Sequence, residues 1–118
     1  MSEHDEQVTL IQWANLQACT YPELSLLLAV PNGARTSMSQ ALKLKAEGLK
    51  RGVPDLFLPV ARNSWHGLFI ELKYGQGKPS VEQCWWSDRL SEQGYLAVVC
   101  WGWIEAGEAR VEYWGLKG

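Results

Sequence analysis

Two short apolar runs, each flanked by charged residues, constrain this chain more than any other feature. Leu56-Phe57-Leu58 follows Pro54-Asp55, and the run from His66 to Ile70 leads into Glu71-Leu72-Lys73. Both runs have the length and residue types of buried strands. Because side chains alternate along a strand, Glu71 and Lys73 share one face while Leu72 points into the core. A strand tolerates proline at its first residue, so Asp55 is expected to lie beside Glu71.

These charged residues indicate which kind of reaction the site could support. Two carboxylates about 4 Å apart repel by roughly 4 kcal/mol at an effective dielectric constant near 20, so a bound cation or a proton is the usual resolution. Oxygen ligands favour Mg²⁺ or Mn²⁺, and a neighbouring ammonium orients an attacking water. We therefore expect phosphodiester hydrolysis, with Asp55 and Glu71 as metal ligands and catalytic residues and Lys73 as the third catalytic residue. The alternative is a Glu71–Lys73 ion pair on a solvated strand face.

The spacing of these residues resembles a known family. Asp55 after a proline, fifteen intervening residues and then Glu71-x-Lys73 resemble the signature of the PD-(D/E)XK nucleases. A longer ordered set resembles the VRR-NUC branch: Pro31-Asn32-Gly33, Gly52-Val53-Pro54-Asp55-Leu56, Gly67 to Lys73, Gln83 and Gly94-Tyr95. The resemblance covers nearly the whole chain. It implies a restriction-endonuclease-like α/β core, a central mixed β-sheet flanked by helices.

The resemblance also implies further site residues. In the family a helical glutamate ahead of the first strand completes the metal site, and Glu6 fits best because Leu10 and Ala14 follow it on one helix face. Glu3 is the runner-up, and capping chemistry in the first helical turn is the alternative account of Glu6. The Leu72 carbonyl is expected to complete the metal shell. Gln83 is expected to support catalysis, although the Ser80-x-x-Gln83 capping box is already a full structural account of it.

Basic residues are unevenly distributed. The net charge is −2, yet residues 32–55 carry five basic side chains against two acids, and residues 82–112 carry six acids against two arginines. This asymmetry permits one basic face that contacts phosphates, although lysines on a helix are often simply solvated. The expected nucleic-acid contacts are Asn32, Arg35, Lys43, Lys45, Lys50, Arg51 and Lys78. Lys78 belongs to a glycine-rich loop directly after Lys73.

The other segments complete an α/β sandwich. The patterns predict a helix capped by Ser2 that runs to about Ala18, a buried strand over Leu24 to Val30, and a helix from Ser37 or Ser39 to Gly48. A helix from Ser80 to Gly94, a strand from Tyr95 to Trp101, and a final helix or hairpin after Gly102 follow.

Length and composition set the remaining bounds. The 118 residues predict a single domain over residues 1–118. The chain has no apolar run near the roughly 18 residues of a membrane span, and its N-terminus is polar, which predicts no membrane association and an intracellular location in a bacterial or phage-infected cell. Cys19, Cys84 and Cys100 are each expected to be small apolar core residues in a reducing compartment rather than zinc ligands.

These observations predict a Mg²⁺- or Mn²⁺-dependent DNA endonuclease that acts on branched DNA. Stand-alone members of the family resemble junction-resolving enzymes, so we expect a homodimer whose two-fold symmetry matches a four-way junction. Adjacent Trp85 and Trp86 point about 100° apart on a helix, so one of them is a candidate partner contact. The alternatives are a nuclease for flaps or other branched DNA and a catalytically silent DNA-binding module with the same fold.

Overall fold

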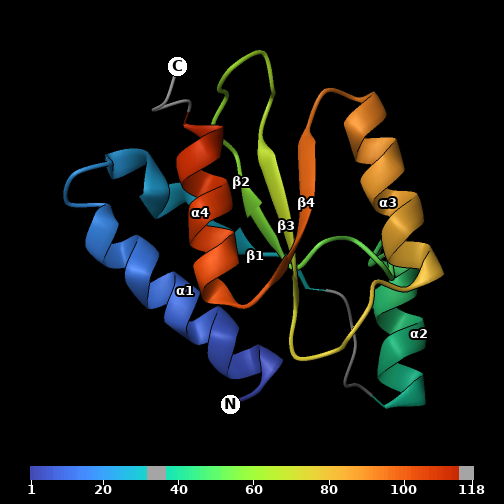
Figure 1. The fold of residues 1–118 in the computed structure, drawn as a ribbon. Coiled ribbons are helices and arrows are strands. Elements are labelled where there is room, and N and C mark those ends of the chain that lie inside the picture. The colour runs from blue at the N-terminus through green and yellow to red at the C-terminus, as the bar shows by residue number, and fades with distance from the viewer. Residues whose placement is uncertain (32–36, 115–118) are drawn as a thin grey trace.

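A four-stranded mixed sheet forms the centre of the protein (Figure 1). The computed structural model describes residues 1–31 and 37–114. The strands lie in the order β1 (Leu28–Ala29), β2 (Leu56–Leu58), β3 (Leu68–Lys73) and β4 (Leu96–Trp101). β2 is antiparallel to both β1 and β3, whereas β3 and β4 are parallel. The predicted α/β fold with a central mixed sheet is confirmed.

Helices lie on both sides of this sheet. α1 (Glu3–Gln17) and α4 (Trp103–Tyr113) pack together on one side, and α3 (Val81–Glu92) lies on the other (Figure 1). α3 connects the parallel strands β3 and β4, a connection that needs a crossover segment of this kind. α2 (Met38–Ala46) has no buried residue and lies near the N-terminal end of α3. After Gly102 the chain forms the helix α4, so of the two structures predicted for this segment the helix is confirmed.

Serine caps begin three of these helices, as the sequence predicts. The Ser2 hydroxyl accepts a hydrogen bond from the Asp5 N–H at 3.1 Å, and the Ser37 hydroxyl accepts one from the Gln40 N–H at 3.2 Å. Ser80 forms the full capping box with Gln83. Each cap satisfies a backbone donor that the first helical turn leaves unpaired.

The core is centred on β2 and β3. Leu56, Leu58 and Leu72 are at most 1% exposed, and every residue of β3 before Lys73 is buried. A strand covered on both faces reads as a continuous apolar run, which explains why the sequence identifies β3 so clearly. The exception to its apolar character is Glu71, which is 1% exposed.

The predicted buried strand over residues 24–30 is wrong. Residues Pro22–Leu26 form a 3-10 helix, and β1 that follows has two exposed residues at the edge of the sheet. Only Leu24 of this 3-10 helix is buried. Pro22 favours the start of a helical turn because its φ is restricted to the helical range, and a short apolar run does not distinguish a strand from a helix.

The expectation for the cysteines is confirmed for Cys100, which is buried, and wrong for Cys19 and Cys84, which are exposed. Cys19 lies in the turn after α1 and Cys84 lies on the outer side of α3, so their positions place them outside the core. Within the described part of the chain, no helix has the length and apolar character that crossing a membrane requires.

Candidate active site

Antiparallel pairing of β2 with β3 brings Asp55 to the end of β3. Leu56 pairs with Ile70, so the residue before Leu56 lies beside the residues after Ile70. The Leu72 N–H donates to Asp55 Oδ2 at 2.8 Å, a bond that holds this carboxylate at the sheet edge. The predicted convergence of Asp55 and Glu71 therefore follows from the strand register.

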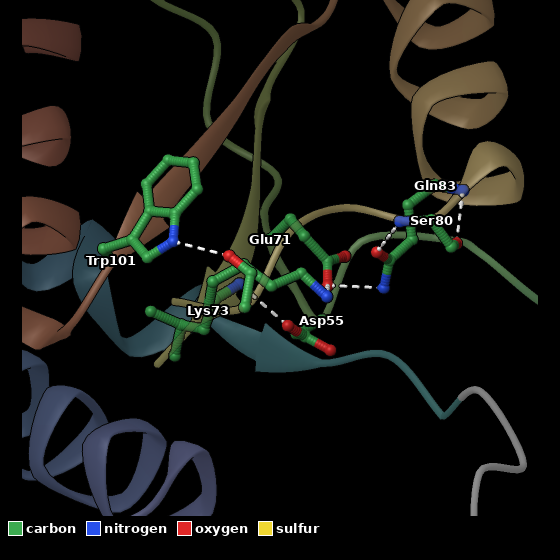
Figure 2. Close-up of polar contacts among 8 residues, drawn as sticks. Asp55, Glu71, Lys73, Ser80, Gln83 and Trp101 are labelled. Atoms are coloured by element: carbon green, nitrogen blue, oxygen red, sulfur yellow. Dashed lines mark hydrogen bonds and ion pairs between the residues drawn. The ribbon is translucent and has the colours of Figure 1, made fainter. Parts of the chain in front are cut away.

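The Glu71 carboxylate lies at the centre of the site (Figure 2). Its Oε2 accepts a hydrogen bond from Gln83 Nε2 at 2.7 Å and lies 3.4 Å from Lys73 Nζ. Its Oε1 is buried and has no hydrogen-bond partner among the described residues. A buried oxygen without a partner carries a large desolvation cost, so this atom indicates a ligand or a proton.

The electrostatics of the site support that reading. Burial, and then the charge of Asp55, raise the pKa of Glu71 to about 8, although Lys73 acts in the opposite direction. Burial also raises the pKa of Asp55. Hydrogen bonds with the Leu72 N–H and the Glu71 side chain, and the charge of Lys73, act to lower this pKa. The two carboxyl groups therefore titrate as a pair, and near neutral pH they retain a proton unless a cation takes its place.

Gln83 forms the predicted capping box and also contacts Glu71. Its Oε1 accepts from the Ser80 N–H at 2.8 Å, and the Gln83 N–H donates to Ser80 Oγ at 3.1 Å. The free amide nitrogen then reaches Glu71 (Figure 2). Capping α3 thus fixes the side chain that orients the buried carboxylate.

The segment before Asp55 packs directly on the first turn of α3. Gly52 has a φ of +97°, and a Cβ at this position would lie 2.8 Å from the backbone carbon of Glu82. Only glycine fits both the backbone conformation and the space. This contact fixes the distance between the helix that carries Gln83 and the segment that leads into Asp55.

The two glutamates of α1 occupy different surroundings. Glu6 Oε1 accepts a hydrogen bond from the Trp103 N–H at 3.0 Å, at the N-terminus of α4. A Cβ on Gly102 would lie 2.8 Å from that oxygen, so the glycine makes room for this carboxylate. Glu3 instead has a pKa raised by partial burial and by the charge of Asp55, and lowered by Lys73. Glu6 thus caps α4, whereas the charges of Asp55 and Lys73 act on Glu3, the runner-up.

The donor set fits a hard divalent cation. Within residues 1–31 and 37–114, no three side chains drawn from histidine, cysteine, aspartate and glutamate form a closed cluster for a metal. Mg²⁺, however, is commonly held by one or two carboxylates together with waters and substrate phosphate oxygens. Asp55 and the unpartnered Oε1 of Glu71 are ligands of this kind.

Three of the predicted phosphate-contacting residues line one surface hollow. Lys45, Lys50 and Arg51 border this hollow of about 370 Å³, which we call the basic hollow, together with apolar residues of α2. Lys43 is exposed on α2 but does not line it, and Lys78 lies apart on the loop after β3. Asn32 and Arg35 lie outside the described residues. Because Arg51 precedes Gly52, the basic hollow adjoins the segment that leads to Asp55.

Sequence reasoning missed Trp101 as a residue of this region. Its indole Nε1 donates to the Gly77 carbonyl at 2.8 Å, and it pairs with Lys73 in the parallel register of β3 and β4. The signal was the predicted order of strand, helix and strand from His66 to Trp101, because strands joined by a helix often run parallel and their carboxyl ends then meet at one edge of the sheet.

Comparisons with known proteins agree with this geometry. The model of the VRR-NUC domain family matches residues 1–103, a range that contains Asp55, Glu71, Lys73 and Gln83. The chain belongs to the VRR-NUC family. A solved structure of a VRR_NUC domain protein is 29% identical to this chain, with a TM-score of 0.85 over 98% of this chain and 90% of the other. No curated protein sequence matches the chain. As a VRR-NUC domain, the protein is a nuclease-type domain with DNA as its substrate class.

Proposed function

We propose that this VRR-NUC domain is a Mg²⁺- or Mn²⁺-dependent endonuclease that hydrolyses phosphodiester bonds in branched DNA. The observation that carries the proposal is the buried Oε1 of Glu71, which lacks a partner beside a second carboxylate. A proton shared with Asp55 satisfies this atom in the metal-free protein, and a divalent cation in its place would neutralise both carboxylates at once. The lysine, the amide of Gln83 and the basic hollow then have roles around one substrate phosphate.

Asp55, Glu71 and the Leu72 carbonyl would hold the metal. Glu6 is engaged by the Trp103 N–H, and Glu3 is the glutamate of α1 on which the charges of Asp55 and Lys73 act. The Leu72 N–H keeps Asp55 in place, and Gln83 keeps Glu71 from rotating. When bound, the metal supplies charge neutralisation and lowers the pKa of an attacking water.

Lys73 contributes a positive charge beside the carboxylates. Its Nζ lies 3.4 Å from Glu71 Oε2, and its side chain is 12% exposed, so the ammonium group is held in place and partly shielded from solvent. An ammonium in this position orients the attacking water and stabilises the negative charge that develops on the phosphate oxygens. The basic hollow would hold the adjoining DNA backbone through phosphates, without reading base sequence.

Branched DNA is the proposed substrate because a homodimer would supply two sites related by a two-fold axis, which matches a four-way junction. The surface of α3 supports a partner contact. Val81 and Trp85 on α3 are 84% and 52% exposed. Apolar exposure of this extent is typical of an interaction site. Trp86 contacts Trp85 edge to face, so the two rings form one unit.

A cleavage panel tests this function. Labelled duplex, flap, splayed and four-way DNA are incubated with the protein in EDTA, Mg²⁺ or Mn²⁺, with Glu71→Gln as the matched inactive variant. We expect divalent-dependent cuts, paired on opposing strands of the junction, that the variant does not make. No cleavage of any substrate with either metal would support the silent DNA-binding module, and preferential cutting of flaps would support the alternative substrate.

The oligomeric state is measured separately. Light scattering should give about twice the chain mass of 13.3 kDa. The Val81→Glu, Trp85→Glu double variant should be monomeric and should lose paired incision while keeping single cuts. A wild-type monomer at tens of micromolar would contradict the dimer and leave the nuclease assignment intact.

A further inference from the structure

A hydrogen bond joins the end of β4 to the loop that follows Lys73. Trp101 Nε1 donates to the Gly77 carbonyl at 2.8 Å (Figure 2). Trp101 pairs with Lys73 across β3 and β4, and the Gly102 N–H donates to the Lys73 carbonyl at 3.1 Å. The Trp101 N–H in turn donates to Glu105 Oε1 at 3.1 Å. The indole is thus attached firmly to the sheet edge that carries the charged cluster.

The loop that Trp101 contacts packs on the stem of Lys73. The Gly77 N–H donates to the Tyr74 carbonyl at 3.1 Å and closes a turn. A Cβ on Gly77 would lie 3.3 Å from that carbonyl oxygen and 3.8 Å from Lys73 Cδ, so the turn lies against the lysine side chain. Lys73 is only 12% exposed at its side chain, although its strand ends there.

Little else holds this loop in place. Residues 74–78 are all exposed, so the loop has no buried side chain that would anchor it in the core. The Trp101 ring is itself 40% exposed, which argues against core packing as its main role. A hydrogen bond from a rigid strand end to an otherwise exposed loop fixes the loop at little cost to the rest of the fold.

We propose that Trp101 is a positioning residue for the nuclease reaction. Its hydrogen bond to Gly77 holds the loop over Lys73 and thereby keeps the Lys73 ammonium next to Glu71. The kinetic part of this inference rests on the proposed function, whereas the contact itself does not. The same bond fixes the backbone of the loop that carries Lys78.

Trp101→Phe tests the proposal because phenylalanine retains an aromatic ring and lacks the N–H donor. Trp65→Phe is the matched control, since Trp65 lies in the turn between β2 and β3 at the opposite end of the sheet. We expect the single-turnover cleavage rate of Trp101→Phe at saturating enzyme to fall about 10-fold, as for other residues that orient a site, while DNA affinity stays within twofold. The control should match the wild-type protein in both.

Two measurements without DNA test the contact directly. Amide hydrogen exchange of residues 74–79 should be faster in Trp101→Phe, with exchange in β3 and β4 unchanged. The rate at which an acylating reagent modifies Lys73, followed by mass spectrometry, should rise in the same variant. These two results stand even if the wild-type chain cuts no DNA, an outcome that would overturn the proposed function alone.

Other outcomes would overturn the positioning role. If amide exchange in the loop and the labelling rate of Lys73 are the same in Trp101→Phe as in the wild-type protein, the hydrogen bond does not hold the loop in place. Faster loop exchange with a wild-type cleavage rate would show that the loop does not position Lys73. Full activity in Trp101→Phe with weakened DNA binding in Trp101→Ala would show that the ring stacks on DNA bases instead.

Discussion

Gln83 donates from Nε2 to Glu71 Oε2 at 2.7 Å while its own Oε1 accepts from the Ser80 N–H at 2.8 Å. One side chain thus caps α3 and orients the buried carboxylate. Because both bonds come from the same amide, the position of α3 and the orientation of Glu71 are set together. The two roles are separable by mutation, since only one of them needs a donor.

Gln83→Glu should retain the capping box and lose the donor to Glu71. A glutamate at this position still accepts from the Ser80 N–H, but its carboxylate would lie against that of Glu71, so the melting temperature in EDTA should fall. Loss of a group that orients a metal ligand should lower the cleavage rate about 10- to 100-fold. Ser80→Ala is the control, because it should lose about 1 kcal/mol of stability with a smaller effect on rate. Wild-type activity of Gln83→Glu would remove Gln83 from the site.

Asp55→Asn, Glu71→Gln and Lys73→Ala should each abolish cleavage in a folded protein. Each change removes charge from the site without emptying the core, and an unneutralised buried carboxylate does not contribute to stability. Glu71→Gln should therefore melt at or above the wild-type temperature in EDTA. Cleavage rates and circular dichroism on purified variants check this. Near-normal cleavage by an Asp55 or Glu71 variant would refute the assignment of the site.

The metal-free protein should lose stability as the pH rises. The folded pKa of Glu71 is about 8 against an ordinary value of 4.5, so the native state binds more protons than the unfolded state between these values. Stability then falls through this window, and the loss is complete above the folded pKa. We expect the melting temperature in EDTA to drop by about 5 °C or more between pH 5 and pH 8.5. The melting temperature of Glu71→Gln should depend less on pH. Equal pH dependence in the variant and the wild-type protein would contradict the raised pKa of Glu71.

Metal binding should release protons. At pH 7 the carboxyl pair retains a proton that a cation displaces, because a metal ligand must be deprotonated. Calorimetric titration of Mn²⁺ in buffers of different ionisation enthalpy should show release of nearly one proton per ion at pH 7 and much less at pH 9. Heats that do not depend on the buffer would mean that Glu71 is already ionised.

The basic hollow should determine the salt dependence of DNA binding. Each neutralised phosphate contributes about 0.9 to the slope of log affinity against log salt, so Lys50→Ala with Arg51→Ala should lower the slope by nearly two. Arg89→Ala is the matched control, because Arg89 pairs with Glu92 on α3 and does not line the hollow. An unchanged slope in the double variant would place the phosphate contacts elsewhere.

The sequence predicts the strands of the site well because their residues face strong physical constraints. β3 is buried on both faces, β2 is buried on the face of Leu56 and Leu58, and the capping box of α3 depends on two residues at a fixed local spacing. Both patterns depend only on residues that are close together in the sequence. They were sufficient to place Asp55 beside Glu71, whereas the position of Gln83 at the site was implied by the family resemblance.

Features that depend on tertiary contacts were harder to predict. Glu3 and Glu6 both lie at the start of α1. Glu6 is engaged by the Trp103 N–H at the start of α4, 97 residues later in the chain, and no local pattern shows which of the two glutamates makes this bond. The exposure of Cys84 depends on which face of α3 meets the sheet. Trp101 gains its role from a bond to a loop 24 residues earlier in the chain. No local pattern encodes these long-range contacts.

The positions of Glu3 and Glu6 on α1 limit which sequence changes this helix can accept. Glu6 joins the helix to the start of α4, while the charge of Asp55 raises the pKa of Glu3, one turn earlier. Each residue of an α-helix advances about 100°, so a single insertion or deletion between the two glutamates would turn one of them away from its partner. Substitutions on the outer face of α1 leave this spacing intact. Apart from the two glutamates, the first turn of α1 should therefore accept changes of residue type far more readily than changes of length.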